Sequence, residues 1–391
     1  MRILTRYVLA EMAKAFLVSL IGLTLLIIIV GVIREAAMQS LPFAQVVQLI
    51  PYILPEALRI AIPVTLLLAA TSVYGRMSGS NEVVAAKALG ISPMAILWPT
   101  FVAAFLLSLV TVWLNDLAVS WGRHGAQRVV VDSVEDIAYS MLRAQKSYSC
   151  PSFSINVNDV KDRRLLSPIL TLQSGRMVVT AEEAELQTDK AANVLRIILH
   201  HPTLDADGRA TADLPGQWEQ EFSLQDASRM RDVSALPSWS SLRVISEQVV
   251  EQEEKIEQME RDLAARAAYQ MLCGDFDDLT DQQWNTQAEN LEVTRGRWYR
   301  LLTEPHRRWS DGFSCLCFVW VGAPMAIRLR NRDFLTSFFL CFLPILIVYY
   351  PLLIYGVDGA KNGTIPPYGV WAKNLLLVGW GAWLLRKVIR Y

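Results

Sequence analysis

The sequence predicts an α-helical integral membrane protein with six transmembrane helices in two groups of three, plus an extracytoplasmic all-β domain and an inserted helical hairpin. Three patterns lead to this fold class: uncharged apolar runs near both ends of the chain, alternating apolar and polar residues in its middle, and helical spacing in a polar segment that follows. Hydrophobic residues make up 52% of the chain, and the formal net charge of -1 gives no sign of a surface for nucleic acid.

The membrane spans are predicted from apolar runs that approach the roughly 20 residues needed to cross a bilayer. These runs occupy residues 15–33, 57–75, 91–114, 312–327, 334–357 and 369–385. Three are weaker than the others, because Arg59 and Lys373 interrupt two of them and the run at 312–327 is short. The first run is longer than the core of a usual signal peptide and lacks an obvious cleavage site, so we expect it to be retained.

Orientation follows from the basic residues at the ends of the spans. With six spans, the following residues all fall on one side of the membrane: Arg2, Arg6, Arg76, Lys87, Arg328, Arg330, Arg332, Arg386, Lys387 and Arg390. By the positive-inside rule this side is the cytoplasm. Both termini are then cytoplasmic, and the large middle region lies outside.

The middle region carries the alternation of half-buried strands. In the stretch SFSINVN, Phe153, Ile155 and Val157 share one face and polar residues share the other. Further strands are expected at residues 138–147, 165–173, 176–186, 194–201 and 217–224, with turns at 174–175 and 205–208. Short, regularly spaced strands of this kind predict an antiparallel sandwich or roll.

A polar segment with helical spacing follows Pro237. Apolar residues recur every three or four positions from Leu242 to Leu263, and a second such stripe begins near Thr280, where Gln283 completes a capping box. We expect two antiparallel helices that pack on each other or on a partner. The predicted domains are therefore residues 1–117 with the first three spans, 118–238 with the strands, 239–304 with the hairpin, and 305–391 with the last three spans.

Motifs for catalysis are missing from the sequence. It contains no phosphate loop, no His-Glu-x-x-His, no paired Cys-x-x-Cys and no Gly-x-Ser-x-Gly. His200 and His201 are neighbours on a predicted strand, so they point to opposite faces and cannot chelate one ion together. The sequence therefore predicts no enzyme, with no catalytic residue, no metal and no cofactor.

Two arginines in or beside the spans are candidates for binding, because a charge in the membrane is costly unless it faces protein, water or an anion. Arg34 and Arg59 both lie toward the outer half of their helices in the predicted topology. One reading places their guanidinium groups on a phosphate or carboxylate in a cavity between spans. The alternative pairs Arg59 with Glu56, three residues away on a helix, or lets either arginine reach the membrane interface.

A short helix is predicted in the cytoplasmic loop between the second and third spans. Ser80 can cap it, Glu82 lies in its first turn, Gly90 can end it, and Pro93 can open the next span. The helix, residues 80–90, is too short to be stable alone and carries Val83 and Lys87 among small apolar residues. It either docks on a soluble partner or lies on the membrane surface.

At these positions the chain resembles the LptF/LptG permease family, which exports lipopolysaccharide from the inner membrane of Gram-negative bacteria. The matching positions, in chain order, are Arg6-Tyr7, Pro63, the loop residues Ser80, Glu82, Gly90 and Ser92, then Glu304, Arg307, Arg308, Pro324, Pro367, Trp371 and Asn374. Each motif is weak alone, but their order covers both groups of spans. The predicted hairpin is longer than expected for this family.

The resemblance implies a periplasmic β-jellyroll and a coupling helix that enters a groove of an LptB-like ATPase dimer. It implies that Glu82 is the main polar contact there, with Ser80, Val83, Lys87 and Gly90 around it. The other implied partners are a second LptF/LptG-like permease subunit, in a heterodimer or homodimer, LptC/LptA-like jellyroll proteins, and lipopolysaccharide or a related glycolipid.

The sequence is also compatible with two other functions. One is a mechanotransmitting permease, in which ATPase movements act on envelope proteins without moving lipid. The other is a membrane-anchored adaptor that binds a partner through the hairpin and needs no ATPase.

Overall fold

The computed structural model describes residues 2–39, 43–150, 152–161, 163–172, 177–189, 192, 194–206, 210–213, 216–224, 237–274, 281–329 and 334–390. The chain forms two compact units. The helical unit comprises Met1–Leu26, Pro55–Ser120 and Leu236–Tyr391, and the β unit comprises Ile27–Leu54 and Trp121–Ala235.

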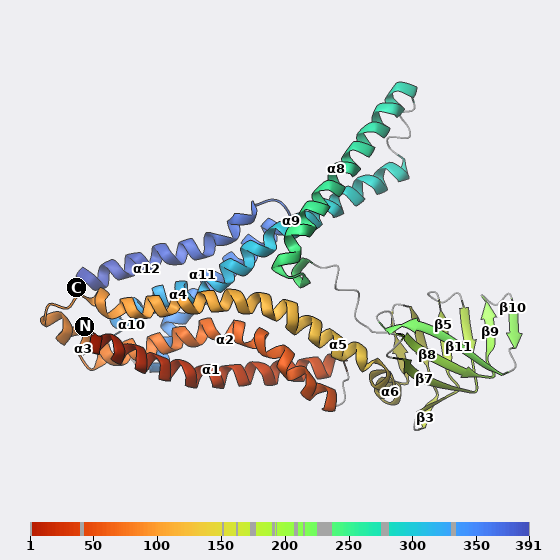
Figure 1. The fold of residues 1–391 in the computed structure, drawn as a ribbon, viewed down its shortest axis with the longest axis horizontal. Helices are drawn as coiled ribbons and strands as arrows, with labels where there is room; N and C mark the ends of the chain where they lie inside the picture. The colour runs from red at the N-terminus through yellow and green to blue at the C-terminus, as the bar shows by residue number, and fades with distance from the viewer. Residues whose placement is uncertain are drawn as a thin grey trace. The chain divides into compact units, whose positions relative to one another are not determined.

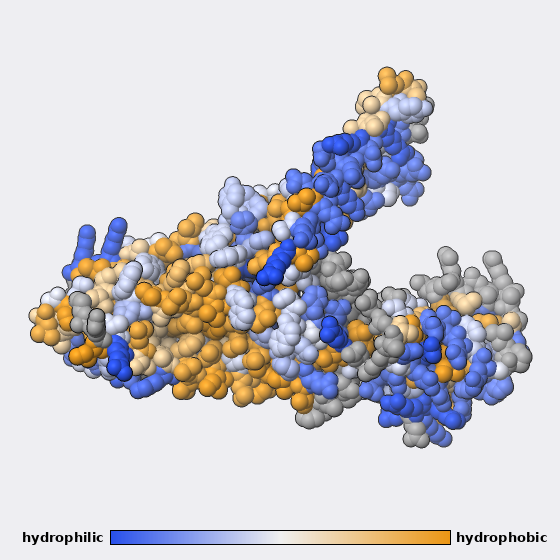
Figure 2. Space-filling model, viewed as in Figure 1, coloured by the Kyte–Doolittle hydropathy of each residue, from blue (hydrophilic) through white to orange (hydrophobic). Residues whose placement is uncertain are grey.

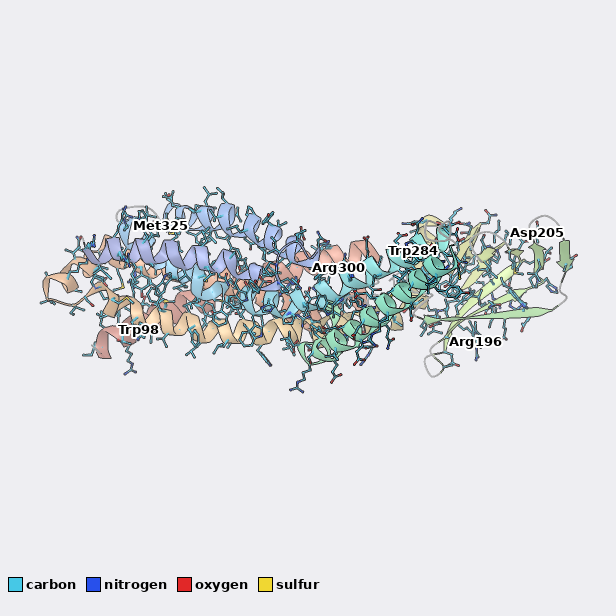
Figure 3. The ribbon with its side chains drawn as sticks, turned by 90° about the horizontal axis from the view of Figure 1, so that it is seen from above. Trp98, Arg196, Asp205, Trp284, Arg300 and Met325 are labelled. Atoms are coloured by element: carbon cyan, nitrogen blue, oxygen red, sulfur yellow. The ribbon has the colours of Figure 1, made fainter. Side chains whose placement is uncertain are left out.

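Long helices build the helical unit, although residues 27–39 of α1 and 43–54 of α2 are assigned to the β unit (Figure 1). They are α1 (Arg2–Gln39), α2 (Phe43–Gly79), α4 (Pro93–Leu117), α8 (Leu242–Cys273), α9 (Gln282–Gly312), α10 (Ser314–Arg328), α11 (Phe334–Lys361) and α12 (Ala372–Arg390), with the short α3 (Glu82–Ala88) between α2 and α4. The chain termini and α3 lie at the same end of this unit, and Trp98 of α4 and Met325 of α10 lie near that end (Figure 3).

Apolar side chains cover the middle of the helical unit (Figure 2). Five helical segments of the described chain are long and apolar enough to cross a membrane: Ile3–Arg34, Val47–Gly79, Pro93–Val131, Gln282–Arg328 and Thr336–Lys361. Between Leu17 and Ile33 of α1 the exposed residues are apolar, with Val18 74% and Ile21 68% exposed. Such a surface is favourable when lipid rather than water surrounds it.

The predicted hairpin is present as α8 and α9. Arg295 donates to Glu260 at 2.7 Å, and Arg266 donates to Gln283 at 3.1 Å, so the two helices are joined by polar contacts along their length. Trp284 lies toward the tip and Arg300 toward the bundle (Figure 3). The cap of α9 is Asp281, which accepts from the Gln282 amide, whereas Thr280 lies outside the described residues.

The β unit contains two antiparallel sheets, in the orders β1-β2-β5-β6-β9-β10 and β11-β8-β7-β4-β3. The strands are β1 (Ser147–Ser149), β2 (Phe153–Asn156), β3 (Asp159–Lys161), β4 (Arg164–Leu166), β5 (Ile169–Leu172), β6 (Met177–Thr180), β7 (Glu183–Asp189), β8 (Val194–His200), β9 (Thr203–Ala206), β10 (Ala210–Asp213) and β11 (Gln217–Ser223). The strands expected near 153, 165, 176, 194 and 217 are confirmed, some as two shorter strands. The turn at 174–175 lies outside the described residues. Of the turn predicted at 205–208, Asp205 and Ala206 belong to β9, and residues 207 and 208 lie outside the described residues.

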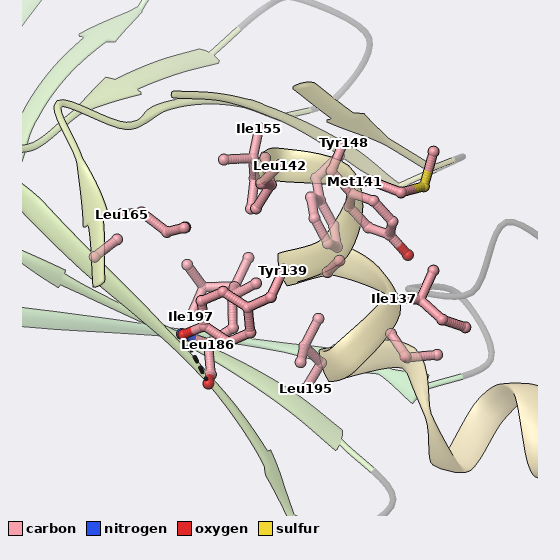
Figure 4. Close-up of a cluster of buried hydrophobic side chains, with 14 of the residues drawn as sticks. Ile137, Tyr139, Met141, Leu142, Tyr148, Ile155, Leu165, Leu186, Leu195 and Ile197 are labelled. Carbon is pink, nitrogen blue, oxygen red and sulfur yellow. Dashed lines mark hydrogen bonds between the residues drawn. The ribbon is translucent and has the colours of Figure 1, made fainter. Parts of the chain in front are cut away.

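The strand predicted at 138–147 is wrong. Residues there belong to α6 (Val134–Gln145), which follows α5 (His124–Asp132). Ile137, Ala138 and Leu142 are buried at helical spacing and join side chains from both sheets in one core (Figure 4). Tyr139 donates to the Arg163 carbonyl at 2.6 Å and accepts from the Leu186 amide at 2.9 Å. Burial raises the pKa of this phenol, partly offset by its hydrogen bond to Leu186, so it stays neutral at ordinary pH.

Candidate functional site

The loop helix α3 is closed at its end by backbone geometry. Gly90 adopts φ 79°, its amide donates to Lys87 at 2.9 Å, and the Ile91 amide donates to Ala86 at 3.0 Å. These two bonds form a Schellman motif, which suits glycine because the left-handed conformation is costly for other residues. Ser92 then caps α4 by accepting from the Ala95 amide at 3.3 Å, and Pro93 begins that helix.

Ser80 does not cap α3. The cap position is Asn81, with φ 63° and no side-chain cap bond. The α2 helix extends to Gly79, so the Ser80 hydroxyl donates back to the Arg76 carbonyl at 2.9 Å and contacts Glu82 Oε1 at 2.9 Å. Ser80 therefore ends α2 and holds the Glu82 carboxylate beside that end.

The two faces of α3 differ. Val83 is only 3% exposed and packs in the core of the helical unit, and Lys87 Nζ donates to the Val388 carbonyl of α12 at 2.9 Å. Leu89, by contrast, is 80% exposed and Val84 is 47% exposed. Thus Val83 and Lys87 hold α3 on the bundle, and Leu89 and Val84 present an apolar surface to the surroundings. Sequence reasoning missed Leu89, although its place just before Gly90 could have marked it.

A second group of charged side chains lies about 30 Å away along α2, since Arg59 and Gly79 are twenty residues apart on one helix. Four ion pairs define this charge cluster: Arg59 with Glu56, Arg307 with Glu304, Arg308 with Asp116 and Lys373 with Asp311. It therefore holds four cations and four carboxylates. Sequence reasoning recognised Arg59 with Glu56 as an alternative, but not the pairing of Lys373, whose side chain is fully buried.

Arg308 and Asp116 connect three helices in the charge cluster. Arg308 donates to Asp116 at 3.0 Å and to the Ser240 carbonyl at 2.7 Å, and Asp116 also accepts from the Leu242 amide at 2.9 Å. Glu304, at 1% exposure, accepts from Arg307 at 2.7 Å and lies 3.8 Å from Arg308. The start of α8 is thereby fixed to the ends of α4 and α9.

A cavity of about 200 Å³ borders the charge cluster. Arg59, Asn115, Asp311, Tyr349 and Tyr350 contribute its polar groups. Because Arg59 and Asp311 are both paired, the cavity offers balanced charge rather than a surplus of cations. Asn115 donates to the Arg308 carbonyl at 3.0 Å, which ties the cavity wall to the same cluster.

Arg34 lies in the β unit, so it is described apart from Arg59. Its side chain is exposed, and no carboxylate whose side chain the structure describes forms an ion pair with it; the side chain of Glu35 is not among these. Among the described residues, no group of three or more His, Cys, Asp or Glu side chains is placed to hold a metal ion.

The protein is a helical multi-pass membrane protein that carries a β-rich region, as its long apolar helices and its two antiparallel sheets indicate. The chain belongs to the family of the lipopolysaccharide export system permease LptF/LptG, whose model matches residues 6–387. This is a family of transport permeases of the inner membrane. No curated protein matches the chain.

Proposed function

We propose that the chain is the permease subunit of an ATP-driven exporter that extracts lipopolysaccharide or a related glycolipid from the inner membrane and passes it to a periplasmic jellyroll bridge. The observation that carries this proposal is the mounting of α3. One face is fixed to the bundle through Val83 and Lys87, and the other exposes Leu89 and Val84. A helix so mounted can receive a push from a soluble subunit and transmit it to α2, α4 and α12.

The energy source in this proposal is an LptB-like ATPase dimer that receives α3 in a groove. Glu82 is its polar contact, held by Ser80, while Val83, Lys87 and Gly90 support the helix from the permease side. A second LptF/LptG-like permease completes the transporter, and LptC/LptA-like jellyroll proteins accept the lipid from the β unit, whose two antiparallel sheets are compatible with a jellyroll.

The proposed topology has six spans, with α12 as the sixth. At 19 residues α12 is about 28 Å long, close to the thickness of a bilayer core of about 30 Å. It packs on both α9 and α10: Asn374 donates to the Ser310 carbonyl of α9 at 2.8 Å, and Trp320 of α10 donates to the Val378 carbonyl at 3.2 Å. Both termini are cytoplasmic and the β unit is periplasmic in this arrangement.

Lipid contacts are proposed for Arg34 and for Arg59. Arg34 is exposed and keeps its charge available for a phosphate, whereas the Arg59 charge is already paired with Glu56. Crosslinking of lipopolysaccharide to the permease should fall in Arg34→Gln and change less in Arg59→Gln. Equal crosslinking in the parent chain and both variants would remove the two arginines from the proposed path.

The coupling proposal is tested by placing a charge on the exposed face of α3. Leu89→Asp should abolish co-purification of the ATPase subunit, because a carboxylate cannot enter an apolar contact without a large desolvation cost. Glu82→Ala should also weaken association. Leu272→Asp is the matched control, since Leu272 is 87% exposed but lies at the hairpin tip. Normal ATPase recovery with Leu89→Asp would show that α3 is not the coupling element.

A mechanotransmitting permease is the second candidate function. It is favoured by the hairpin tip, where Tyr269, Met271 and Leu272 are exposed and apolar, as a contact for an envelope protein would be (Figure 2). A purified complex with bound ATPase but no bound lipopolysaccharide would support this function. Purification without any ATPase would instead support the membrane-anchored adaptor.

A further inference from the structure

A pocket of about 590 Å³ lies beside α3, where that helix meets the ends of α2, α10 and α12. Four helix ends form it: Ser78 from α2, Val83, Val84 and Lys87 from α3, Ile327 and Arg328 from α10, and Lys387 and Val388 from α12. None of these residues belongs to the charge cluster around Arg308. All of them lie in the helical unit.

The walls of this pocket are held by hydrogen bonds between helices. The Ser78 hydroxyl donates to the Ile327 carbonyl at 2.7 Å, which joins α2 to α10. The Lys87 ammonium donates to the Val388 carbonyl at 2.9 Å, which joins α3 to α12. The pocket is therefore a built feature of the bundle rather than a gap between independent helices.

The charge of the pocket is one-sided. Lys87, Arg328 and Lys387 line it, and among the residues that the structure describes no carboxylate does. Within the described part of the chain none of these three cations forms an ion pair, and Lys387 lies over the Trp383 ring at 3.8 Å from its centroid. Cations that line one pocket repel one another, so an anion that enters the pocket relieves this repulsion and is attracted by all three.

The pocket also has an apolar part, and an apolar surface beside cations suits a lipid better than a simple anion. Val83, Val84, Ile327 and Val388 contribute apolar surface beside the cations. Trp383, 51% exposed, does not line the pocket but contacts Lys387, and its aromatic ring is of the kind that is enriched at membrane interfaces. We propose that this pocket binds the phosphate headgroup of an anionic membrane lipid, with the first part of an acyl chain on the valine and isoleucine side chains.

A bound headgroup would connect α3 to α10 and α12, because the three cations come from these three helices. Occupancy would therefore stiffen the mounting of α3 and strengthen any coupling that passes through it. Assignment of the lipid to the cytoplasmic leaflet rests on the topology under the proposed function. The binding itself does not, and it is measurable whether or not the chain exports lipopolysaccharide.

The test is lipid binding to the full-length chain in detergent, followed by native mass spectrometry with phosphatidylglycerol and with zwitterionic phosphatidylcholine. The parent chain should retain phosphatidylglycerol preferentially. The double variant R328Q/K387Q should bind it roughly 25-fold more weakly, since each cation near a membrane surface contributes about a fivefold factor. Lys87 is left in place because it also holds α3.

The matched control is R386Q/R390Q, which removes two cations from α12 outside the pocket. This variant should bind phosphatidylglycerol as the parent chain does. An equal loss in the control, or no loss in R328Q/K387Q, would overturn the proposal. Displacement of the lipid by millimolar inorganic phosphate would show a site for free anions and would also overturn it.

A soluble partner with acidic groups is the remaining competitor for these cations. If R328Q/K387Q lost the ATPase subunit but kept full affinity for phosphatidylglycerol, the pocket would belong to that protein contact and the lipid site would be refuted. Loss of lipid binding with normal ATPase recovery supports the lipid site. Lipid affinity and recovery of the ATPase subunit are measured on the same folded preparation. Neither measurement depends on lipopolysaccharide export, so a failure of the proposed export function would not change the result for the lipid site.

Discussion

The two ends of the helical unit differ in whether their charged side chains are paired. Around Arg308 each cation has a carboxylate, whereas the pocket beside α3 holds three cations without a carboxylate in the described chain. Charges that are balanced by the protein itself contribute to its architecture, because breaking a buried pair leaves an uncompensated charge. Charges that the protein leaves unbalanced are available to something outside it. The net charge of the surrounding side chains therefore distinguishes an arginine with a structural role from one that can bind a ligand. The position of the arginine within a membrane span does not distinguish them as well.

The largest test of this comparison is Glu304→Gln. The change leaves Arg307 and Arg308 without the buried carboxylate between them, and the expected loss is about 3–5 kcal/mol of unfolding free energy. Thermal unfolding in detergent measures it. Glu257→Gln, in the exposed pair with Arg261, is the control and should cost under about 1 kcal/mol. Similar losses in both variants would contradict a structural role for the charge cluster.

A smaller effect is expected from Gly90→Ala at the other end. No atom lies within 4 Å of the position of the added methyl group, so the cost comes from φ alone and should be about 1–2 kcal/mol. Hydrogen exchange of the α3 amides should accelerate while global unfolding stays unchanged. Gly79→Ala has equal space and no positive φ, so it is the matched control. Unchanged exchange in Gly90→Ala would show that backbone geometry does not hold α3.

The smallest effect is expected for R328Q/K387Q in the absence of added lipid. Neither cation has a carboxylate partner in the described chain, so the unfolding free energy should change by less than about 0.5 kcal/mol. Addition of phosphatidylglycerol should raise the melting temperature of the parent chain and not that of the variant. A large loss of unfolding free energy in R328Q/K387Q without lipid would show that Arg328 and Lys387 have a structural role, as the residues of the charge cluster do. The two ends of the helical unit would then not differ in the way described.

Local signals in the sequence predicted most of the fold. The apolar runs mark the helices that can cross a membrane, and alternation marks strands such as β8, where Leu195, Ile197 and Leu199 are fully buried. The error at α6 has a local cause as well. A window that starts at residue 138 omits Val134 and Ile137, which complete the helical spacing with Met141 and Leu142.

The candidate site was less predictable, because its contacts join distant parts of the chain. Glu56 and Arg59 are three residues apart, so their pairing follows from helix geometry. Asp116 and Arg308 are separated by 192 residues, and no sequence pattern brings them together. The inward direction of Lys87 depends in the same way on Val388 at the far end of the chain. The exposed face of α3 could not be assigned until its docked face was known.

The near-continuity of α9 and α10 has a mechanical consequence. The two helices are separated only by Phe313, whose backbone is itself helical, and α9 is tied to α4 and α8 close to that point. The 31 residues of α9 extend about 46 Å, so a tilt of about 5° at its base would move its far end by about 4 Å. If the hairpin moves as one rigid piece, a small rotation of α9 near Arg308 therefore produces a larger displacement at Tyr269 and Leu272.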